Sequence, residues 1–342
     1  MGASAGGFEA FQQLIARLPP DLDAAIFIVW HMAPTVQGVL PQVLGKLTTI
    51  PVAHACDGEA IQTNRIYVAP PDHHLLIEDG RTRVTHGPKE NRFRPAIDPL
   101  FRSAAYAYGN RVVGVLLSGA LDDGTAGLWA IKHRGGLALV QDPREALVAS
   151  MPENAIRQVA IDFVVPVAQL AARLVQLAGE DVSPTSPVAM EEEEKTKTEI
   201  RIAADETALG LTLSRYGQPS AYACPDCHGV LTKLTEGTRT RFRCHTGHAY
   251  SADSLLAAVT EKIEDSLYNA LRGMDESVLL LNQLGDQFAE ANQPKQAALY
   301  FQKAQETTQR GELVRQAVRQ HESLSQEKLA PQAADLLPDE LR

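Results

Sequence analysis

The sequence predicts an α/β protein built on a doubly wound, mostly parallel sheet, followed by a small zinc ribbon and a helical hairpin. Short apolar runs alternate with helix-like stretches in the first half of the chain, a compact group of cysteines follows, and two long helical patterns come last. We expect five segments: an α/β domain at 1–179, an acidic linker at 180–199, a ribbon-like module at 200–250, a helical hairpin at 251–326 and a tail at 327–342.

Short continuous apolar runs predict the strands of a parallel sheet, because such strands are buried on both faces. Two further runs, Leu75–Ile77 and Arg83–Thr85, are joined through Glu78-Asp79-Gly80 and predict a hairpin. The predicted parallel strands are Ala25–Trp30, Ile66–Ala69, Val112–Leu117, Leu137–Val140 and Phe163–Val165.

Helix-like stretches lie between these runs. Phe8–Leu18 places its large apolar residues on one face, as expected for a helix that packs on a sheet. This alternation of strand and helix is typical of an α/β sheet with helices on both faces. The other predicted helices are Pro99–Tyr108, Thr125–His133, Pro152–Val159 and Val167–Leu177.

The second half of the chain has a different character. Residues 180–199 combine proline, serine and an acidic run, which predicts a disordered linker. Residues 251–326 predict two long helices with a break near Asn292–Pro294, and the tail beyond them is expected to be loose. The apolar positions expected to form the internal seam of the helical pair are Leu255, Leu256, Val259, Ile263, Leu267, Leu271, Leu299, Phe301, Leu313 and Val314.

Composition narrows the class of protein. The 342 residues are 44% hydrophobic and 22% charged, which is ordinary for a globular chain of about two domains. A net charge of −10 argues against a nucleic-acid partner, whose phosphates attract basic surfaces. We find no apolar run of about 18 residues and no signal-peptide pattern, so we expect a cytoplasmic protein with no membrane insertion. Its four cysteines are then expected as metal ligands or thiols rather than disulfides.

A glycine-rich turn at the start of the chain is the first candidate site. Gly2-Ala3-Ser4-Ala5-Gly6 has the Gly-x-Ser-x-Gly pattern of a nucleophile elbow, and a predicted helix follows it. The free N–H groups at the start of that helix can hold a developing oxyanion, and the small neighbours leave the Ser4 hydroxyl exposed. A phosphate-binding turn of a dinucleotide fold has a similar pattern, so the motif alone is compatible with both.

A histidine and two aspartates follow other predicted strands. His31 comes directly after Ala25–Trp30, where a dinucleotide fold would place an acidic residue for the ribose. A histidine there can instead act as general base toward a serine. Asp122 and Asp123 follow a later strand, and either can orient the imidazole or merely cap the next helix.

These groups are expected to converge, because the carboxyl ends of parallel strands meet at one edge of a sheet. The order serine, histidine, aspartate also differs from the serine, aspartate, histidine order of α/β-hydrolases. The sequence therefore predicts a serine hydrolase with a different fold.

Residues 2–178 resemble the catalytic domain of the chemotaxis protein-glutamate methylesterase family, CheB. The resemblance implies a methylesterase-like catalytic domain in which Ser4, His31 and Asp123 are catalytic, since the family's aspartate directly precedes a glycine. It also implies hydrolysis of glutamate methyl esters, and deamidation of glutamines, on methyl-accepting chemotaxis receptors. The matching segments are GASAGG at 2–7, HMAP at 31–34, GEAIQTNRIYVAPPDHHLLI at 58–77, RPAIDPLFRSAA at 94–105, LLSGALDDGTAG at 116–127 and ASMPENAI at 149–156.

The chain departs from the family pattern in three ways. The family has a strand that ends just before the catalytic serine, whereas Met1 stands where that strand should finish. Either the start lies upstream or the sheet lacks its central strand and holds Ser4 poorly. Ala5 and Ala120 replace the family's usual threonine and methionine, and the receiver domain common at the family's N-terminus is absent, so control by phosphorylation in cis is not expected.

The cysteine region predicts a structural zinc site. Cys224, Cys227, Cys244 and His248 have the spacing C-x2-C-x16-C-x3-H, which presents four ligands tetrahedrally and leaves no open position for catalysis. His245 is the alternative fourth ligand; the turn at Thr246-Gly247 favours His248. Similar segments trail standalone members of the resembled family. The neighbouring Arg239, Arg241 and Arg243 are expected on a solvated strand face.

We therefore expect a serine esterase that acts on receptor-type proteins, needs no catalytic cofactor, and uses N–H groups near Ala5 and Gly6 as the oxyanion hole. The alternative is a catalytically weak adaptor, with Ser4 misplaced by the missing strand. Such an adaptor would bind a chemosensory partner, such as a helical receptor, through the zinc module and the hairpin, or self-associate through the hairpin. A dinucleotide-binding enzyme is a more distant third.

Overall fold

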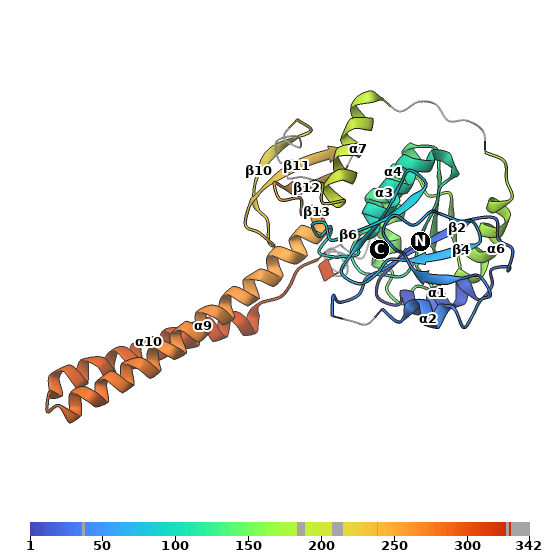
Figure 1. The fold of residues 1–342 in the computed structure, drawn as a ribbon. Coiled ribbons are helices and arrows are strands. Elements are labelled where there is room, and N and C mark those ends of the chain that lie inside the picture. Colours follow the sequence, from blue (N-terminus) through green and yellow to red (C-terminus); the bar gives the residue numbers. More distant parts are fainter. Residues whose placement is uncertain (36–37, 183–188, 207–214, 238, 326–327, 330–342) are drawn as a thin grey trace, which may run out of the picture. The chain divides into compact units, whose positions relative to one another are not determined.

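The computed structural model describes residues 1–35, 38–182, 189–206, 215–237, 239–325 and 328–329. The chain divides into two compact units, with the division between Leu255 and Leu256. The first unit holds a central parallel sheet and a smaller antiparallel sheet, and the second unit is helical (Figure 1).

The central sheet has seven strands in the order β3-β4-β2-β1-β7-β8-β9, and every pair of neighbours is parallel. This confirms the predicted doubly wound α/β sheet. The edge strand β3 was not expected from the sequence. The strands are β1 (Gly2–Ala3), β2 (Ala25–Trp30), β3 (Val52–His54), β4 (Arg65–Val68), β7 (Val113–Leu116), β8 (Leu137–Gln141) and β9 (Phe163–Val165).

Helices cover both faces of this sheet because successive strand residues point to opposite sides. Val115 and Leu117 pack in one apolar cluster with α1, α2 and α6, while Leu116 packs in the other with α3, α4 and α5. The helices are α1 (Gly7–Ile15), α2 (Leu40–Leu44), α3 (Ile97–Tyr108), α4 (Thr125–His133), α5 (Ser150–Gln158) and α6 (Val167–Ala178), with a short 3-10 helix at Gly109–Arg111.

The central position of the sheet is filled by β1. Gly2 and Ala3 pair with β2 on one side, and Gly2 pairs with β7 on the other. The Met1 carbonyl accepts a hydrogen bond from the amide of Val29, so the pairing begins at the first residue. The alternative of a sheet without its central strand is therefore wrong. The strand is short, but it lies between its two neighbours and leads directly into Ser4.

The predicted hairpin is confirmed by β5 (His74–Glu78) and β6 (Arg81–Thr85), which are antiparallel. Its two turn residues, Asp79 and Gly80, both have positive φ angles of 48° and 74°. This is the backbone of a type I′ turn, which matches the twist of the flanking strands.

The composition of residues 180–199 predicts a disordered linker. Over the described part of this segment the prediction is wrong. Residues 183–188 lie outside the described residues, but Met190–Ala203 form helix α7. This helix buries Glu199 and Ile202 against the rest of the first unit. The prediction fails because Glu199 is neutralised by arginines that are distant in the sequence, and composition does not reveal such partners.

The second sheet, which we define as strands β10 to β13, is antiparallel. Cys244 ends β12, and Cys224 and Cys227 lie in the turn between β10 and β11. The arginines of this sheet correct another expectation. Arg239, Arg241 and Arg243 are buried rather than solvated, because they form ion pairs with Glu90, Glu199 and Glu236. The strands are β10 (Gly217–Ala223), β11 (Val230–Glu236), β12 (Arg239–Cys244) and β13 (Ala249–Ser251).

The second unit contains most of α9 (Ala252–Glu290) and α10 (Pro294–Gln320), joined by a break at 291–293 that lies where the sequence predicts it. The predicted seam is partly wrong. Leu299 and Leu313 are 52% and 66% exposed, and small residues of α10 are buried instead. These are Ala297, Ala304 and Gly311.

Small residues allow the two helices to approach closely. The Phe301 ring, for example, occupies the space that a Cβ atom on Gly285 would need. Among the described residues, no helix is both long and apolar enough to cross a bilayer.

Candidate active site and metal centre

Ser4 and His31 lie side by side at one edge of the central sheet. Ala3 pairs with Trp30, so the next residue of each strand, Ser4 and His31, leaves the sheet at the same level. Neighbouring strands are about 4.8 Å apart, which brings the two side chains close to each other. Both residues are almost buried, with exposed fractions of 9% and 8%.

The turn after Ser4 is fixed by its backbone. The Ser4 amide donates to the Ser118 carbonyl over 2.9 Å, and the Ser4 carbonyl accepts from the Gly7 amide over 3.0 Å. Gly6 has a φ of 73° and lies so close to Ser118 that a Cβ atom would come within 2.6 Å of its hydroxyl oxygen. Only glycine fits this combination of left-handed backbone and close approach, which explains the Gly-x-Ser-x-Gly pattern.

His31 is held between a carboxylate and an aromatic ring. Its Nε2 lies 2.7 Å from Oδ2 of Asp123, and its ring stacks on Phe93 with a centroid separation of 3.7 Å. The other ring nitrogen, Nδ1, is buried and has no hydrogen-bond partner among the described residues. In this geometry Nε2 carries the proton toward Asp123, which leaves the lone pair of Nδ1 open.

Asp123 is a buried carboxylate surrounded by donors. Besides His31, the amide of Ile97 donates to it over 2.6 Å, Asn91 Nδ2 over 2.9 Å and the amide of Asp98 over 3.3 Å. Burial alone would raise the pKa of Asp123, but the hydrogen bond and charge of His31 and the other donors outweigh it and lower the pKa. The carboxylate therefore stays ionised beside the imidazole, as an orienting group requires.

The sequence leaves Asp122 and Asp123 as alternatives until the resemblance favours Asp123, and the geometry separates them. Asp123 contacts His31, whereas Asp122 accepts a hydrogen bond from the hydroxyl of Ser251 in the second sheet, over 2.7 Å. Asp122 and Asp123 have different partners because the side chains of adjacent residues in this loop point in different directions.

Two residues of this site escape the sequence analysis. Asn91 donates to Asp123, and Phe93 stacks on His31. Both belong to a segment that precedes the RPAIDPLFRSAA match and has no strand or helix pattern of its own. The only available signal was its position directly before that match, which does not specify a role.

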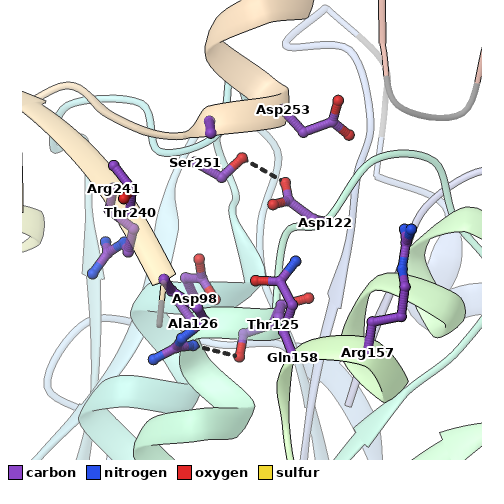
Figure 2. Close-up of a pocket in the computed structure, with 12 residues that line it drawn as sticks. Asp98, Asp122, Thr125, Ala126, Arg157, Gln158, Thr240, Arg241, Ser251 and Asp253 are labelled. Carbon is purple, nitrogen blue, oxygen red and sulfur yellow. Dashed lines mark hydrogen bonds between the residues drawn. The ribbon is translucent and has the colours of Figure 1, made fainter. Parts of the chain in front are cut away.

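A cavity of about 330 Å³ lies beside the site, where the second sheet meets helices α4 and α5. Figure 2 shows Asp98 and Asp122 among the side chains that line it, with the hydrogen bond from Ser251 to Asp122. Burial and the charge of Asp123 raise the pKa of Asp98 to about 7. Burial also raises the pKa of Asp122 to about 7, although the bond from Ser251 acts in the opposite direction.

These raised pKa values predict a pH-dependent stability. Between pH 4 and about pH 7 the folded protein keeps the proton on Asp122 while the unfolded chain loses it, so stability falls as pH rises through this window. Asp122→Asn removes this loss. We expect the free energy of unfolding in urea, variant minus wild type, to increase by on the order of a few kcal/mol from pH 5 to pH 8. The exposed Asp21→Asn is the matched control, and an equal difference at both pH values would contradict the expectation.

The four predicted metal ligands are brought together. The ligand atoms of Cys224, Cys227, Cys244 and His248 all lie within 4.8 Å of one another. Cys227 Sγ is 3.7 Å from Cys244 Sγ, and His248 Nδ1 is 3.6 Å from Cys244 Sγ. A tetrahedron with metal–sulfur bonds of about 2.3 Å has edges of about 3.8 Å, so this arrangement fits a tetrahedral ion.

The surroundings favour His248 over His245 as the fourth ligand. His245 is not in the cluster; its ring packs where a Cβ atom on Gly229 would lie. Thr246 Oγ1 lies 3.0 Å from Cys244 Sγ and 3.1 Å from Cys227 Sγ, where a hydroxyl can donate to ligand sulfurs. Such outer contacts orient the ligands of a metal site.

Comparison with known proteins agrees with the geometry over the first half of the chain. The CheB methylesterase family model matches residues 1–174. A relative from Leptospira interrogans is 39% identical over 178 residues, which are 52% of this chain and 92% of that protein. The protein-glutamate methylesterase/protein-glutamine glutaminase 2 of Anaeromyxobacter dehalogenans is 37% identical over 52% of each chain, so only about half of that protein is matched.

A solved structure supports the same fold. The catalytic domain of the Thermotoga maritima CheB methylesterase superposes with a TM-score of 0.50 and 31% identity, over 52% of this chain and 95% of that domain. The family model ends before the second sheet and the helical unit. With the serine turn, the histidine and the aspartate at one edge of a matching sheet, the chain belongs to the CheB methylesterase family.

Proposed function

We propose that this protein is a serine esterase that hydrolyses glutamate γ-methyl esters on chemoreceptor-type proteins. The 2.7 Å contact between His31 and Asp123, next to Ser4 at the edge of the sheet, is the observation that carries the proposal. The names of the relatives supply the substrate class.

The two ring nitrogens of His31 would have separate roles. Nε2–H donates to Asp123, which fixes the tautomer and stabilises the imidazolium form. Nδ1 is then the base, because its lone pair is the one without a partner among the described residues. No hydrogen bond joins Ser4 Oγ to His31 among the described residues, so the relay requires Ser4 Oγ to approach His31 Nδ1 in the substrate complex.

In the first half of the reaction, Ser4 Oγ attacks the ester carbonyl carbon and its proton passes to His31 Nδ1. The tetrahedral intermediate breaks its bond to the methoxy oxygen, which takes the proton and leaves as methanol. In the second half, water attacks the acyl-enzyme, His31 accepts one proton of the water, and this proton returns to Ser4 as the bond to Ser4 Oγ breaks. The glutamic acid side chain that is released then loses its proton to solvent and becomes the carboxylate. Glutamine would follow the same course with ammonia as the leaving group.

The backbone amides of Ala5 and Gly6 are our candidates for the oxyanion hole. They follow Ser4 directly and precede α1, and neither amide donates a hydrogen bond within the described part of the chain. Oriented amides of this kind stabilise a developing oxyanion strongly, because they need no reorganisation when charge forms.

The adaptor alternative carries less weight. It depended on a sheet without a central strand, and β1 fills that position. The direct test is methanol release from a methylated receptor fragment. A protein that releases no methanol and does not react with a serine-directed fluorophosphonate would restore the adaptor.

We further propose that the cysteine cluster holds a structural zinc ion. Three thiolates and one imidazole are the ligands of a closed tetrahedral site, and the 3.6 and 3.7 Å separations suit zinc. Zinc would supply folding free energy to the second sheet and take no part in the hydrolysis.

This assignment predicts about one zinc per chain by elemental analysis of the purified protein. Cys244→Ser removes one thiolate, and we expect it to lose most of the metal and to lower the thermal stability. Cys56→Ser is the matched control, because Cys56 is exposed and lies outside the cluster. A wild-type protein that folds with no bound metal, or a Cys244→Ser variant that keeps a full equivalent, would refute the zinc site.

A further inference from the structure

Asn91 lies between the proposed triad and the second sheet. Its side-chain nitrogen Nδ2 donates to Asp123 Oδ1 and to Asp98 Oδ2, both over 2.9 Å. Its side-chain oxygen accepts from the amide of Ser251 over 3.0 Å and from the hydroxyl of Ser254 over 3.2 Å. Asn91 is buried, and each polar end of its amide is used.

The backbone of the same segment is joined to the second sheet. The amide of Asn91 donates to the carbonyl of Ala249 over 2.8 Å, and the amide of Ala249 donates to the carbonyl of Lys89 over 3.2 Å. Ala249 of strand β13 therefore forms a parallel bridge with the loop that carries Asn91. Asn91 itself has a φ of 49°, a left-handed conformation that asparagine tolerates better than most residues.

We propose that Asn91 is a positioning residue for the esterase, and that β13 and the first turn of α9 hold it in place. The side chain of Asn91 fixes the Asp123 carboxylate in the plane that meets His31, and the second sheet prevents Asn91 from rotating away. The inference rests on the proposed triad and adds a role for the C-terminal half of the chain.

The path from the cysteine cluster to the triad is short. His248, one of the proposed metal ligands, directly precedes Ala249, which bonds to the Asn91 backbone. Asn91 bonds to Asp123, and Asp123 bonds to His31. Hydrogen bonds through Asn91 thus connect the folded second sheet to the carboxylate of Asp123.

The test uses Asn91→Gly in the full chain. Glycine adopts the positive φ and keeps the backbone bond to Ala249, so only the side-chain contacts are lost. The readouts are the rate constant for labelling by a serine-directed fluorophosphonate and the number of labelled sites per chain at completion. We expect one labelled site per chain and a rate constant about 10- to 100-fold lower, the range for one hydrogen bond to a charged group.

A second variant removes a contact from the other side. Ser254→Ala deletes one hydrogen bond to Asn91, and two contacts with Ser251, without touching Asp123. We expect labelling about 2- to 10-fold slower, the range for one neutral hydrogen bond to Asn91. Ser220→Ala is the matched control: Ser220 lies in strand β10, and its hydroxyl donates to the carbonyl of Leu231, away from the loop. We expect it to label at the wild-type rate. If Asn91→Gly does not fold, the labelling rate of Ser254→Ala is the test, and a wild-type rate for this variant overturns the positioning role.

The outcomes separate this inference from the proposed function. Labelling of Asn91→Gly at the wild-type rate overturns the positioning role. So does a reduced number of labelled sites whose remaining fraction reacts normally, because that indicates unfolding. A wild type that labels but releases no methanol removes the proposed substrate and leaves the labelling comparison valid. A wild type that never labels removes the triad, and the role of Asn91 with it.

Discussion

Replacement of Ser4 by alanine should abolish hydrolysis, with kcat falling by about 10⁴-fold or more. The loss is expected to be large because Ser4 is the proposed source of the attacking oxygen, and the nearby Ser118 hydroxyl already donates to the Ala5 carbonyl over 2.7 Å. Alanine removes only the hydroxyl, so the short strand and the turn at Gly6 should remain. Substrate binding should change little, and the variant should melt close to the wild-type temperature.

The measurement is methanol release from a methylated receptor fragment at saturating substrate, together with fluorophosphonate labelling. Ser266→Ala is a suitable control, since its hydroxyl is exposed on α9 and donates to the backbone carbonyl of Lys262 over 2.8 Å. Methanol release from Ser4→Ala at the wild-type rate would disprove the mechanism, whatever the behaviour of the other variants.

Asp123→Asn should lower kcat by about 10³- to 10⁴-fold. The carboxylate now accepts from His31, Ile97 and Asn91, so an amide nitrogen at this position would face at least one donor with another donor. The imidazole would also lose the charge that stabilises its protonated form. Because the site is buried, we expect a loss of stability of about 1–3 kcal/mol as well.

The matched control for this variant is Asp122→Asn. An asparagine at 122 can still accept from Ser251, so activity should stay within a few-fold of the wild type. A double variant of Ser4 and Asp123 should be no slower than Ser4→Ala alone, because the two residues act as one unit. Full activity of Asp123→Asn, or equal effects at 122 and 123, would contradict the assignment.

Sequence periodicity predicts the central sheet because its rules are local. A continuous apolar run such as Ala25–Trp30 indicates a strand that is buried on both faces. The spacing of the apolar residues in Phe8–Leu18 indicates which face of the helix is buried. The convergence of Ser4, His31 and an aspartate is predictable for the same reason, since strand ends in a parallel sheet meet at one edge. The family resemblance then favoured Asp123 over its neighbour.

The features that sequence could not predict depend on contacts between distant segments. The composition of α7 indicates disorder, but Glu199 is paired with Arg102 and Arg241. The leucines of α10 have helical spacing and were expected to face α9. Small residues of α10 are buried there instead. Asn91 has no motif, because its importance comes from four partners that the fold assembles around one amide.

The ion pairs of Glu90 limit how this chain can be divided or recombined. Glu90 belongs to the family-matched half, yet it is fully buried and paired with Arg243 over 2.8 Å as well as with Arg102. A buried charge that loses its partner costs about 3–5 kcal/mol, which is a large part of a typical domain's stability. Exchange of the C-terminal half for an unrelated module would remove Arg243 from Glu90 and Glu199 from Arg102, which leaves Glu90 and Arg102 paired with each other. A module grafted onto the family-matched half would have to cover this remaining pair, as α7 and β12 now do, or leave both side chains exposed to solvent.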